Sequence, residues 1–181
     1  MSSSGFRIVG ERVVHDGYVI SLAIATVEAP DGHSFERDIV HHPGAVAVVA
    51  VEGDQAVLVR QYRVAIDDSL LEVVAGKRDV DGEALEITAQ RELEEEIGLH
   101  AGSLELLARF HNSPGFCDEL LHVFLATELT EVPMRRDGVE EQAMTIERID
   151  LVDVPSLIES GELRDAKTII GLTLAREKLR R

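Results

Sequence analysis

Residues 91–99 read Arg-Glu-Leu-Glu-Glu-Glu-Ile-Gly-Leu, and this stretch decides how the rest of the chain is interpreted. Apolar residues recur upstream of it at helical spacing, and Gly98 is a typical helix stop, so the sequence predicts a helix from about residue 84 to residue 97. One stripe of this helix is apolar and should face a sheet. The stripe consists of Leu85, Ala89, Leu93 and Ile97.

The same helix carries three carboxylates on one side. At 3.6 residues per turn, Glu92, Glu95 and Glu96 lie together beside the apolar stripe, whereas Glu94 points nearly the opposite way. Like charges one turn apart repel, so a cation should compensate them. Oxygen ligands of this kind suit hard divalent ions such as Mg²⁺. From the helix alone, two interpretations stay open: a metal site, or an acidic face exposed to solvent.

The residues before the helix narrow this choice. Glu83 precedes Arg91 by eight positions, and Gly76 lies further upstream. Together they resemble the Nudix box of Nudix hydrolases: Gly, five residues, Glu, seven residues, then Arg-Glu-hydrophobic-any-Glu-Glu-any-Gly-hydrophobic. The match from Glu83 to Leu99 holds at every specified position, and the one departure is that six residues separate Gly76 from Glu83. An extra loop residue costs little, because loop-closure entropy grows slowly with length.

The resemblance implies a set of metal and catalytic residues. Mg²⁺, with Mn²⁺ as the alternative, would be bound by Glu92, Glu95, Glu96 and the backbone carbonyl of Ala75. Glu96 would also be catalytic, and Arg91 would orient the glutamates. The alternative for Arg91 is a surface ion pair, which contributes little stability.

Outside the box, the chain is similar to the ADP-ribose pyrophosphatase branch of the family. The resemblance implies Mg²⁺-dependent hydrolysis of the diphosphate bond of ADP-ribose to AMP and ribose 5-phosphate. Three alternatives stay open: hydrolysis of another nucleotide sugar such as GDP-mannose, a catalytically silent ADP-ribose sensor, and an acidic interaction module. The similar segments are Val-Arg-Gln-Tyr-Arg at 59–63, Leu-Glu-Val-Val-Ala-Gly at 71–76, Ser-Pro-Gly at 113–115 and Asp-Ala-Lys-Thr at 165–168.

Four residues are candidates for contact with such a substrate. The guanidinium of Arg63 is suited to clamp diphosphate oxygens. Glu72 would hold substrate or pair with an arginine, and Ser113 and Gly115 would offer hydroxyl and backbone N–H groups. Each has a purely structural alternative: an ion pair for Arg63, a strand-edge charge for Glu72, and a tight turn for Ser113 and Gly115.

A catalytic base is expected on the polar loop at 137–142. In the resembling enzymes a glutamate on a mobile loop in this region serves as base or as an additional metal ligand. Glu140 is slightly favoured over Glu141, and the alternative is that both are solvated loop charges.

The order of predicted elements indicates an α/β fold of two parts. Residues 45–181 should form a Nudix-type α/β/α sandwich with a mixed sheet, preceded by a small β domain at 1–44. By the resemblance, this N-terminal part pairs with a second subunit and helps to contact substrate, which implies a homodimer. Predicted strands cover 7–14, 18–28, 34–40, 45–51, 56–59, 70–75, 104–110, 120–128 and 143–149, and further helices cover 154–159 and 166–178.

Composition excludes several classes of function. With 18 Lys and Arg against 34 Asp and Glu, the 181-residue chain has a net charge of −16, which opposes binding to nucleic acid or anionic lipid. The single cysteine, Cys117, forbids an internal disulfide. The N-terminal residues carry no basic and apolar leader pattern, and no apolar run is long enough for a membrane span. These features predict a cytoplasmic protein. The small nucleoside diphosphate sugar expected as its partner is implied by the family resemblance.

Overall fold

The computed structural model describes residues 4–136 and 138–180. The chain forms two compact units, one made of residues up to Gly44 with His111–Leu120, and the other of Ala45–Phe110 with the residues from Leu121 onward. The predicted second domain, 45–181, therefore contains a segment, 111–120, that packs with the N-terminal unit.

The N-terminal unit is an antiparallel meander. Its strands pair in the order β1 (Arg7–Asp16), β2 (Ser21–Glu28) and β3 (Ser34–His41), as the sequence predicted. β2 begins later than expected, because a tight turn in which Gly17 N–H donates to Ile20 C=O at 2.9 Å precedes it. The segment 116–118 lies beside β3, since Val40 N–H donates to Phe116 C=O at 2.7 Å.

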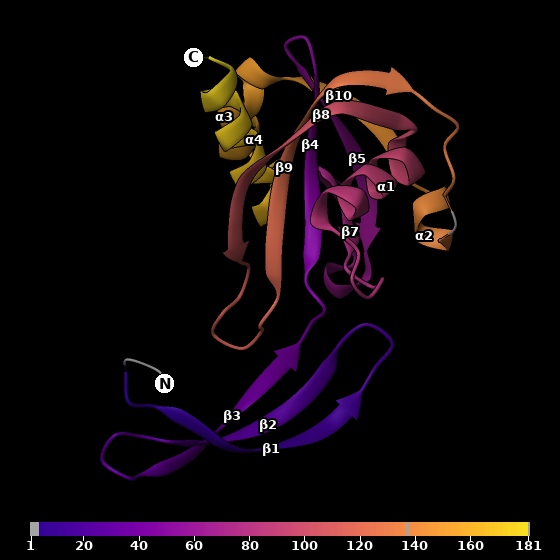
Figure 1. Ribbon diagram of the computed structural model, residues 1–181. Coiled ribbons are helices and arrows are strands. Elements are labelled where there is room, and N and C mark those ends of the chain that lie inside the picture. Colours follow the sequence, from indigo (N-terminus) through magenta and orange to yellow (C-terminus); the bar gives the residue numbers. More distant parts are fainter. Residues whose placement is uncertain (1–3, 137, 181) are drawn as a thin grey trace. The chain divides into compact units, whose positions relative to one another are not determined.

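The second unit is built on a mixed sheet, as predicted (Figure 1). Its strand β4 is parallel to β9 and antiparallel to β5 and β7. The predicted strand 70–75 is divided at Val73, because β6 pairs with β5 whereas β7 pairs with β4. The path β10-β5-β4-β9-β8 comprises Thr145–Asp150, Gln55–Arg63, Ala45–Glu52, Leu120–Glu131 and Leu99–His111; β6 is Asp68–Glu72 and β7 is Val74–Lys77.

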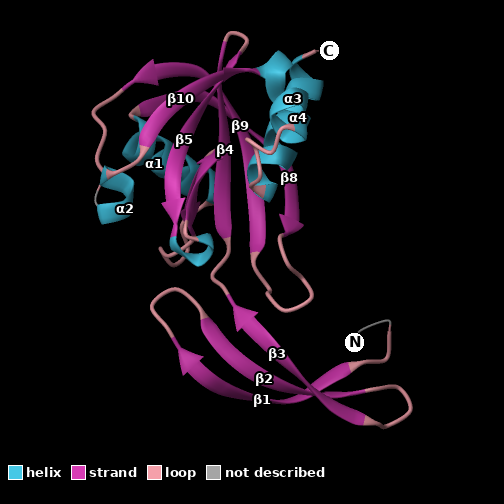
Figure 2. Ribbon diagram, turned by 180° about the vertical axis from the view of Figure 1, so that it is seen from behind, coloured by secondary structure: helices cyan, strands magenta, loops and turns pink. Residues whose placement is uncertain are grey.

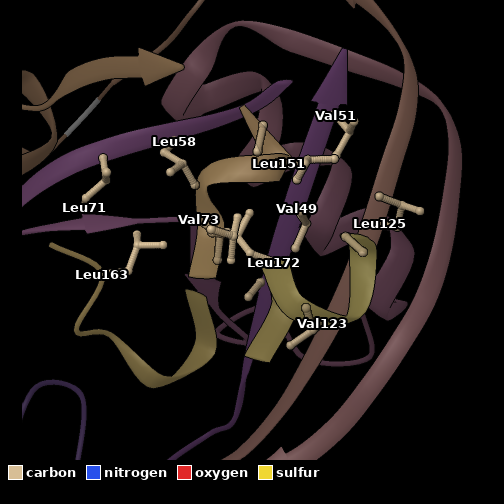
Figure 3. Close-up of a cluster of buried hydrophobic side chains, with 14 of the residues drawn as sticks. Val49, Val51, Leu58, Leu71, Val73, Val123, Leu125, Leu151, Leu163 and Leu172 are labelled. Atoms are coloured by element: carbon tan, nitrogen blue, oxygen red, sulfur yellow. The ribbon is translucent and has the colours of Figure 1, made fainter. Parts of the chain in front are cut away.

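Helices cover both faces of this sheet and complete the predicted α/β/α sandwich (Figure 2). Helix α1 (Leu85–Ile97) packs on one face, and α3 (Val154–Glu159) with α4 (Ala166–Leu179) packs on the other. Alternate residues of a strand point to opposite faces. Val49 accordingly packs with Leu172 of α4 (Figure 3), whereas Val48 lies in the cluster that includes Leu93 of α1. Burial on both faces explains why β4 is an almost unbroken apolar run.

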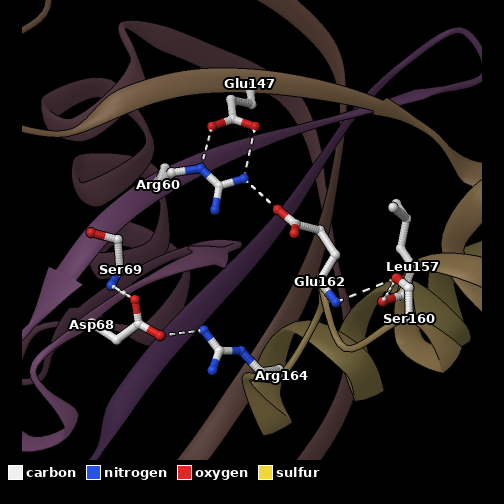
Figure 4. A network of polar contacts seen from close by, with 8 residues as sticks. All are labelled: Arg60, Asp68, Ser69, Glu147, Leu157, Ser160, Glu162 and Arg164. Atoms are coloured by element: carbon white, nitrogen blue, oxygen red, sulfur yellow. Dashed lines mark hydrogen bonds and ion pairs between the residues drawn. The ribbon is translucent and has the colours of Figure 1, made fainter.

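Ion pairs tie the edge of the sheet to the loop before α4 (Figure 4). Arg60 on β5 donates through Nε to Glu147 of β10 at 2.6 Å and through Nη2 to Glu162 at 2.6 Å. Arg164 donates to Asp68 of β6 at 2.6 Å. These side chains are partly exposed, so the pairs contribute modestly to stability.

The remaining elements are short. The predicted polar loop at 137–142 contains a single helical turn, α2 (Val139–Gln142), and the loop's Asp137 lies outside the described residues. Val64–Ile66 (η1) and Leu151–Asp153 (η2) are 3₁₀ turns. Among the described residues, no helix is long and apolar enough to cross a membrane.

Candidate active site

Packing of helix α1 on the sheet fixes the positions of its carboxylates. Ala89 and Leu93 are fully buried, and Gly98 ends the helix in the left-handed conformation (φ 66°), with its N–H donating to Glu94 C=O at 3.1 Å. With this stripe packed, Glu92 and Glu96 lie one turn apart at the border of the core.

Glu96 is a buried carboxylate with incomplete hydrogen bonding. Its residue is 4% exposed, and its Oε2 atom has no partner in the part of the chain that the structure describes. Burial, followed by the charges of Glu92 and Glu141, raises the pKa of Glu96 to about 8, against the smaller effects of a backbone hydrogen bond from Ala75 and the charge of Arg63. The fold therefore keeps an acidic group where its ionised form lacks compensation.

Glu92 lies directly against the backbone of β7. A Cβ atom added to Gly76 would come within 1.9 Å of Glu92 Cδ, so only glycine admits the carboxylate here. Burial raises the pKa of Glu92 to about 7, and the charges of Glu95 and Glu141 add to this, whereas Arg91 opposes it. The close approach accounts for a glycine at position 76 despite the extra loop residue that follows it.

Arg91 is a cation that hydrogen-bonds three carboxylates around the start of the acidic stretch of α1. Its Nη1 donates to Glu92 at 2.8 Å and to Glu95 at 3.1 Å, and its Nη2 to Glu83 at 3.4 Å. Glu95 is the most exposed of these three glutamates, with 36% of its side chain accessible. Arg91 thus links the predicted metal ligands Glu92 and Glu95 to the loop before the helix.

The two glutamates of α2 lie in different electrostatic surroundings. The charge of Glu141 raises the pKa of both Glu92 and Glu96, whereas the charge of Glu140 acts on Tyr62 of β5. Glu141 also accepts a hydrogen bond from Gly138 N–H at 3.3 Å, which closes the turn. Of the two predicted bases, Glu141 is therefore the one whose charge reaches the carboxylates of α1.

Arg63 and Glu72 form a bidentate pair. Arg63 Nε and Nη2 donate to the two Glu72 oxygens at 2.7 and 2.6 Å, and Lys167 of α4 also donates to Glu72. Glu72 is 1% exposed, which differs from an ordinary strand-edge charge. Despite burial, its hydrogen bonds with Arg63 and the charge of Lys167 lower the pKa of Glu72. The charge of Arg63 in turn reaches Glu96.

The remaining predicted residues lie in two places. Ala75 precedes Gly76 on β7 and hydrogen-bonds Glu96 through its backbone, as described above. Ser113 and Gly115 belong to the N-terminal unit, where Ser113 C=O accepts from Cys117 N–H at 2.9 Å in a tight turn. A Cβ at Gly115 would meet no atom within 4 Å, so packing does not require glycine there.

The donor chemistry of α1 fits a hard divalent cation. All its candidate ligands are oxygens, and Glu96 Oε2 lacks a partner among the described residues. Burial and neighbouring carboxylates raise the pKa of Glu92 and Glu96, which a bound cation would reverse. In residues 4–136 and 138–180, no three or more His, Cys, Asp or Glu side chains already converge as a metal-binding group. The fit therefore rests on chemistry and charge, not on a closed arrangement of ligands.

The sequence did not predict the roles of Lys167 and Arg136, two side chains that join distant segments of this region through hydrogen bonds. Lys167 lies within the quoted segment 165–168 but 95 positions after its partner Glu72, and no local pattern links the two. Arg136 lies just before the polar loop at 137–142, and its bonds to main-chain carbonyls leave no periodic signal in the sequence.

Fold and site together define an α/β/α sandwich with a carboxylate-bearing helix on one face of a mixed sheet. Residues 40–169 match the family model described as NUDIX domain, and the chain belongs to the Nudix family.

Individual relatives agree with this assignment. The chain is 41% identical to an ADP-ribose pyrophosphatase of Bacillus subtilis, covering 95% of this chain and 93% of that protein. It is 36% identical to a methanol dehydrogenase activator of Bacillus methanolicus, with 92% and 90% covered. It is 35% identical to an ADP-ribose pyrophosphatase of Mycobacterium tuberculosis, with 95% and 84% covered. Among solved structures, the fold is similar to the crystal structure of ADP compounds hydrolase, with a TM-score of 0.86 at 23% identity over 99% of this chain and 97% of that one.

Proposed function

We propose that this Nudix protein hydrolyses the diphosphate bond of ADP-ribose to AMP and ribose 5-phosphate, with Mg²⁺ as cofactor and Mn²⁺ as the alternative. The observation that carries the proposal is the pair Glu92 and Glu96 on the Nudix helix: Glu96 is buried, Glu92 is partly buried, and burial raises the pKa of both carboxyl groups. Relatives named ADP-ribose pyrophosphatase over nearly the whole chain support the choice of substrate.

Each residue of the site has a defined task in this proposal. Glu92, Glu95 and Glu96, with the carbonyl of Ala75, would hold the metal. When bound, Mg²⁺ neutralises charge on the diphosphate and activates a water molecule for attack. Arg91 fixes the carboxylates of Glu92 and Glu95 through the bonds given above.

Other residues are proposed to accept the proton of the attacking water and to bind the substrate. We assign the base to Glu141 over Glu140, because the charge of Glu141 reaches Glu92 and Glu96. Its carboxylate accepts the proton that the attacking water loses. Arg63, anchored on Glu72, presents its guanidinium to the diphosphate, and Ser113 and Gly115 are proposed to contact the substrate through hydroxyl and backbone N–H groups.

Substrate choice is tested by comparing ADP-ribose with GDP-mannose. We expect AMP release from ADP-ribose to require Mg²⁺ or Mn²⁺, and kcat/KM for ADP-ribose to exceed that for GDP-mannose at least tenfold, about 1.4 kcal/mol. Initial rates on both substrates, with and without chelator, check this. A preference for GDP-mannose would reassign the substrate, and tight ADP-ribose binding without turnover would favour the sensor.

We also propose that the chain has two domains, 1–44 and 45–181, and that the protein is a homodimer formed through the N-terminal unit. Strand β1 lies at the edge of its three-stranded sheet, and every one of its residues is exposed. Ile8, Val9, Val13 and Val14 are each at least half exposed, and a long apolar edge strand of this kind normally pairs or is covered.

The dimer is tested by light scattering on the intact protein. Val13→Glu is expected to lower the measured mass from two chains to one, because a charge on an apolar interface is costly to bury. Val152→Glu introduces the same charge on an exposed residue of η2 and should leave the mass unchanged. A parent protein with the mass of one chain would contradict the proposal.

We propose a cytoplasmic location as well, with which the free Cys117 thiol accords.

A further inference from the structure

The segment after β9 runs across the C-terminal end of α1. Val132 N–H donates to Gly98 C=O at 2.9 Å, and Arg135 N–H donates to Glu95 C=O at 3.3 Å. The last carbonyls of a helix have no partner within the helix, so these bonds satisfy groups that the helix end leaves open. A Cβ at Gly98 would come within 3.0 Å of Val132 C=O, which indicates how closely the segment is docked.

Arg136 continues this contact with its side chain. Its Nε donates to Glu96 C=O at 2.8 Å, and its Nη1 donates to Met144 C=O at 2.6 Å. The two carbonyls lie on different elements: Glu96 is on α1, and Met144 is the residue just before β10. Because a guanidinium is a planar fork of fixed geometry, it can hold two carbonyls at once, which a lysine cannot do in the same way.

In the sequence, the α2 turn lies between Arg136 and Met144, two of the residues that form this bridge. It has only four residues, none of them buried, and a single turn is marginal without support from elsewhere. Met144, in contrast, is 4% exposed and packs in the cluster on the α1 side of the sheet. Its N–H donates to Glu141 C=O at 3.1 Å. The position of Glu141 therefore depends on where Met144 and Arg136 hold the ends of the turn.

We infer that Arg136 is a positioning residue for catalysis: by bonding Glu96 C=O and Met144 C=O, it holds the Glu141 turn beside the helix that carries Glu96. The inference rests on the proposed function, in which Glu141 is the base. Arg136 itself touches neither substrate nor metal in this account, and its effect passes through Glu141.

A double-mutant cycle tests this inference on the intact protein. We expect Arg136→Gln and Arg136→Lys to lower kcat for ADP-ribose at least tenfold while KM changes less than threefold. The matched control is Arg135→Gln, since Arg135 hydrogen-bonds α1 through its backbone N–H, which the substitution keeps, and this variant should keep the parent rate. In a Glu141→Gln background, Arg136→Gln should cause little further loss of kcat, because the base through which it acts is already absent.

Contradicting results are distinct for the two proposals. If the Arg136→Gln loss persists in full in the Glu141→Gln background, or appears in KM alone, Arg136 does not act through Glu141. If the parent does not hydrolyse ADP-ribose, the proposed function fails, and amide hydrogen exchange then decides the bridge separately. Arg136→Gln should speed exchange of Gln142 N–H, which donates to Gly138 C=O, at least tenfold without changing exchange in α1. Unchanged exchange at Gln142 would overturn the bridge itself.

Discussion

Glu96→Gln is expected to lower kcat for Mg²⁺-dependent AMP release from ADP-ribose at least 100-fold, equivalent to about 2.7 kcal/mol of barrier. The substitution keeps the size of the side chain and removes the charge that a metal ion would neutralise. Since Glu96 is 4% exposed, water cannot take over the lost oxygen ligand. Steady-state rates at saturating Mg²⁺ measure the effect.

The same variant should be more stable than the parent when metal is chelated. The pKa of Glu96, about 8, lies above its ordinary value of 4.5, so the folded protein binds more protons than the unfolded chain between these values. The free energy of unfolding of the metal-free parent should therefore fall as pH rises from about 4.5 to about 8. Glu96→Gln removes this dependence on Glu96, and a gain of about 1 kcal/mol at pH 8 would raise Tm by about 2–4 °C.

Glu94→Gln is the matched control, because it is the same change on the same helix. Glu94 is bonded to Gln90 at 3.0 Å and to His100 at 2.8 Å, away from the carboxylate cluster, so its loss should alter kcat less than twofold, about 0.4 kcal/mol. Equal losses in the two variants would mean that the acidic helix acts only through its overall charge. Full activity in Glu96→Gln would remove the metal-binding interpretation of this residue.

Local patterns predicted most of the fold. The order of strands and helices predicted a mixed sheet with helices packed on it, and the family resemblance placed helices on both faces. The apolar run 45–51 predicted a strand buried on both faces, and these faces pack against α1 and α4. The helical spacing of Leu93 and Glu96 likewise placed one in the core and the other at its border. Such features depend on neighbours in sequence, and periodicity reports them.

The contacts that join distant segments could not be predicted in this way. The sequence offered Glu72 as a substrate contact or a partner for an arginine, and the structure adds Lys167 from the last helix. The sequence slightly favoured Glu140 over Glu141 as the base. The two adjacent glutamates look alike in the sequence, and their electrostatic surroundings differ only once α2 has formed. The choice between these two glutamates depends on the conformation of the α2 turn, and the neighbouring residues in a loop determine its conformation only weakly.

Lys167→Met is expected to lower the free energy of unfolding by about 2–3 kcal/mol, because it removes one of the two cations that hydrogen-bond the buried carboxylate of Glu72 among the described residues. Glu72 is 1% exposed and Lys167 is 9% exposed, so water can compensate little of the loss. Methionine keeps most of the length and the apolar stem of the lysine. Urea unfolding at constant m-value measures the change.

Lys178→Met supplies the control on the same helix. Lys178 pairs with Glu105, but both side chains are largely exposed, at 41% and 56%, so the loss should not exceed about 0.5 kcal/mol. An equal loss in both variants would contradict the view that burial makes the Glu72 contact costly to break.

The double variant Glu72→Leu with Lys167→Met separates stability from function. Replacing a buried ion pair by apolar residues is often neutral or stabilising, so the double variant should recover most of the stability that Lys167→Met loses. Its KM for ADP-ribose should nevertheless rise above that of the parent, because Arg63 loses the bidentate anchor that directs its guanidinium, and its charge would no longer be fixed near Glu96. Recovered stability together with a raised KM for ADP-ribose would mean that the buried charges serve to orient Arg63, whereas recovery of both would make the cluster a structural element alone.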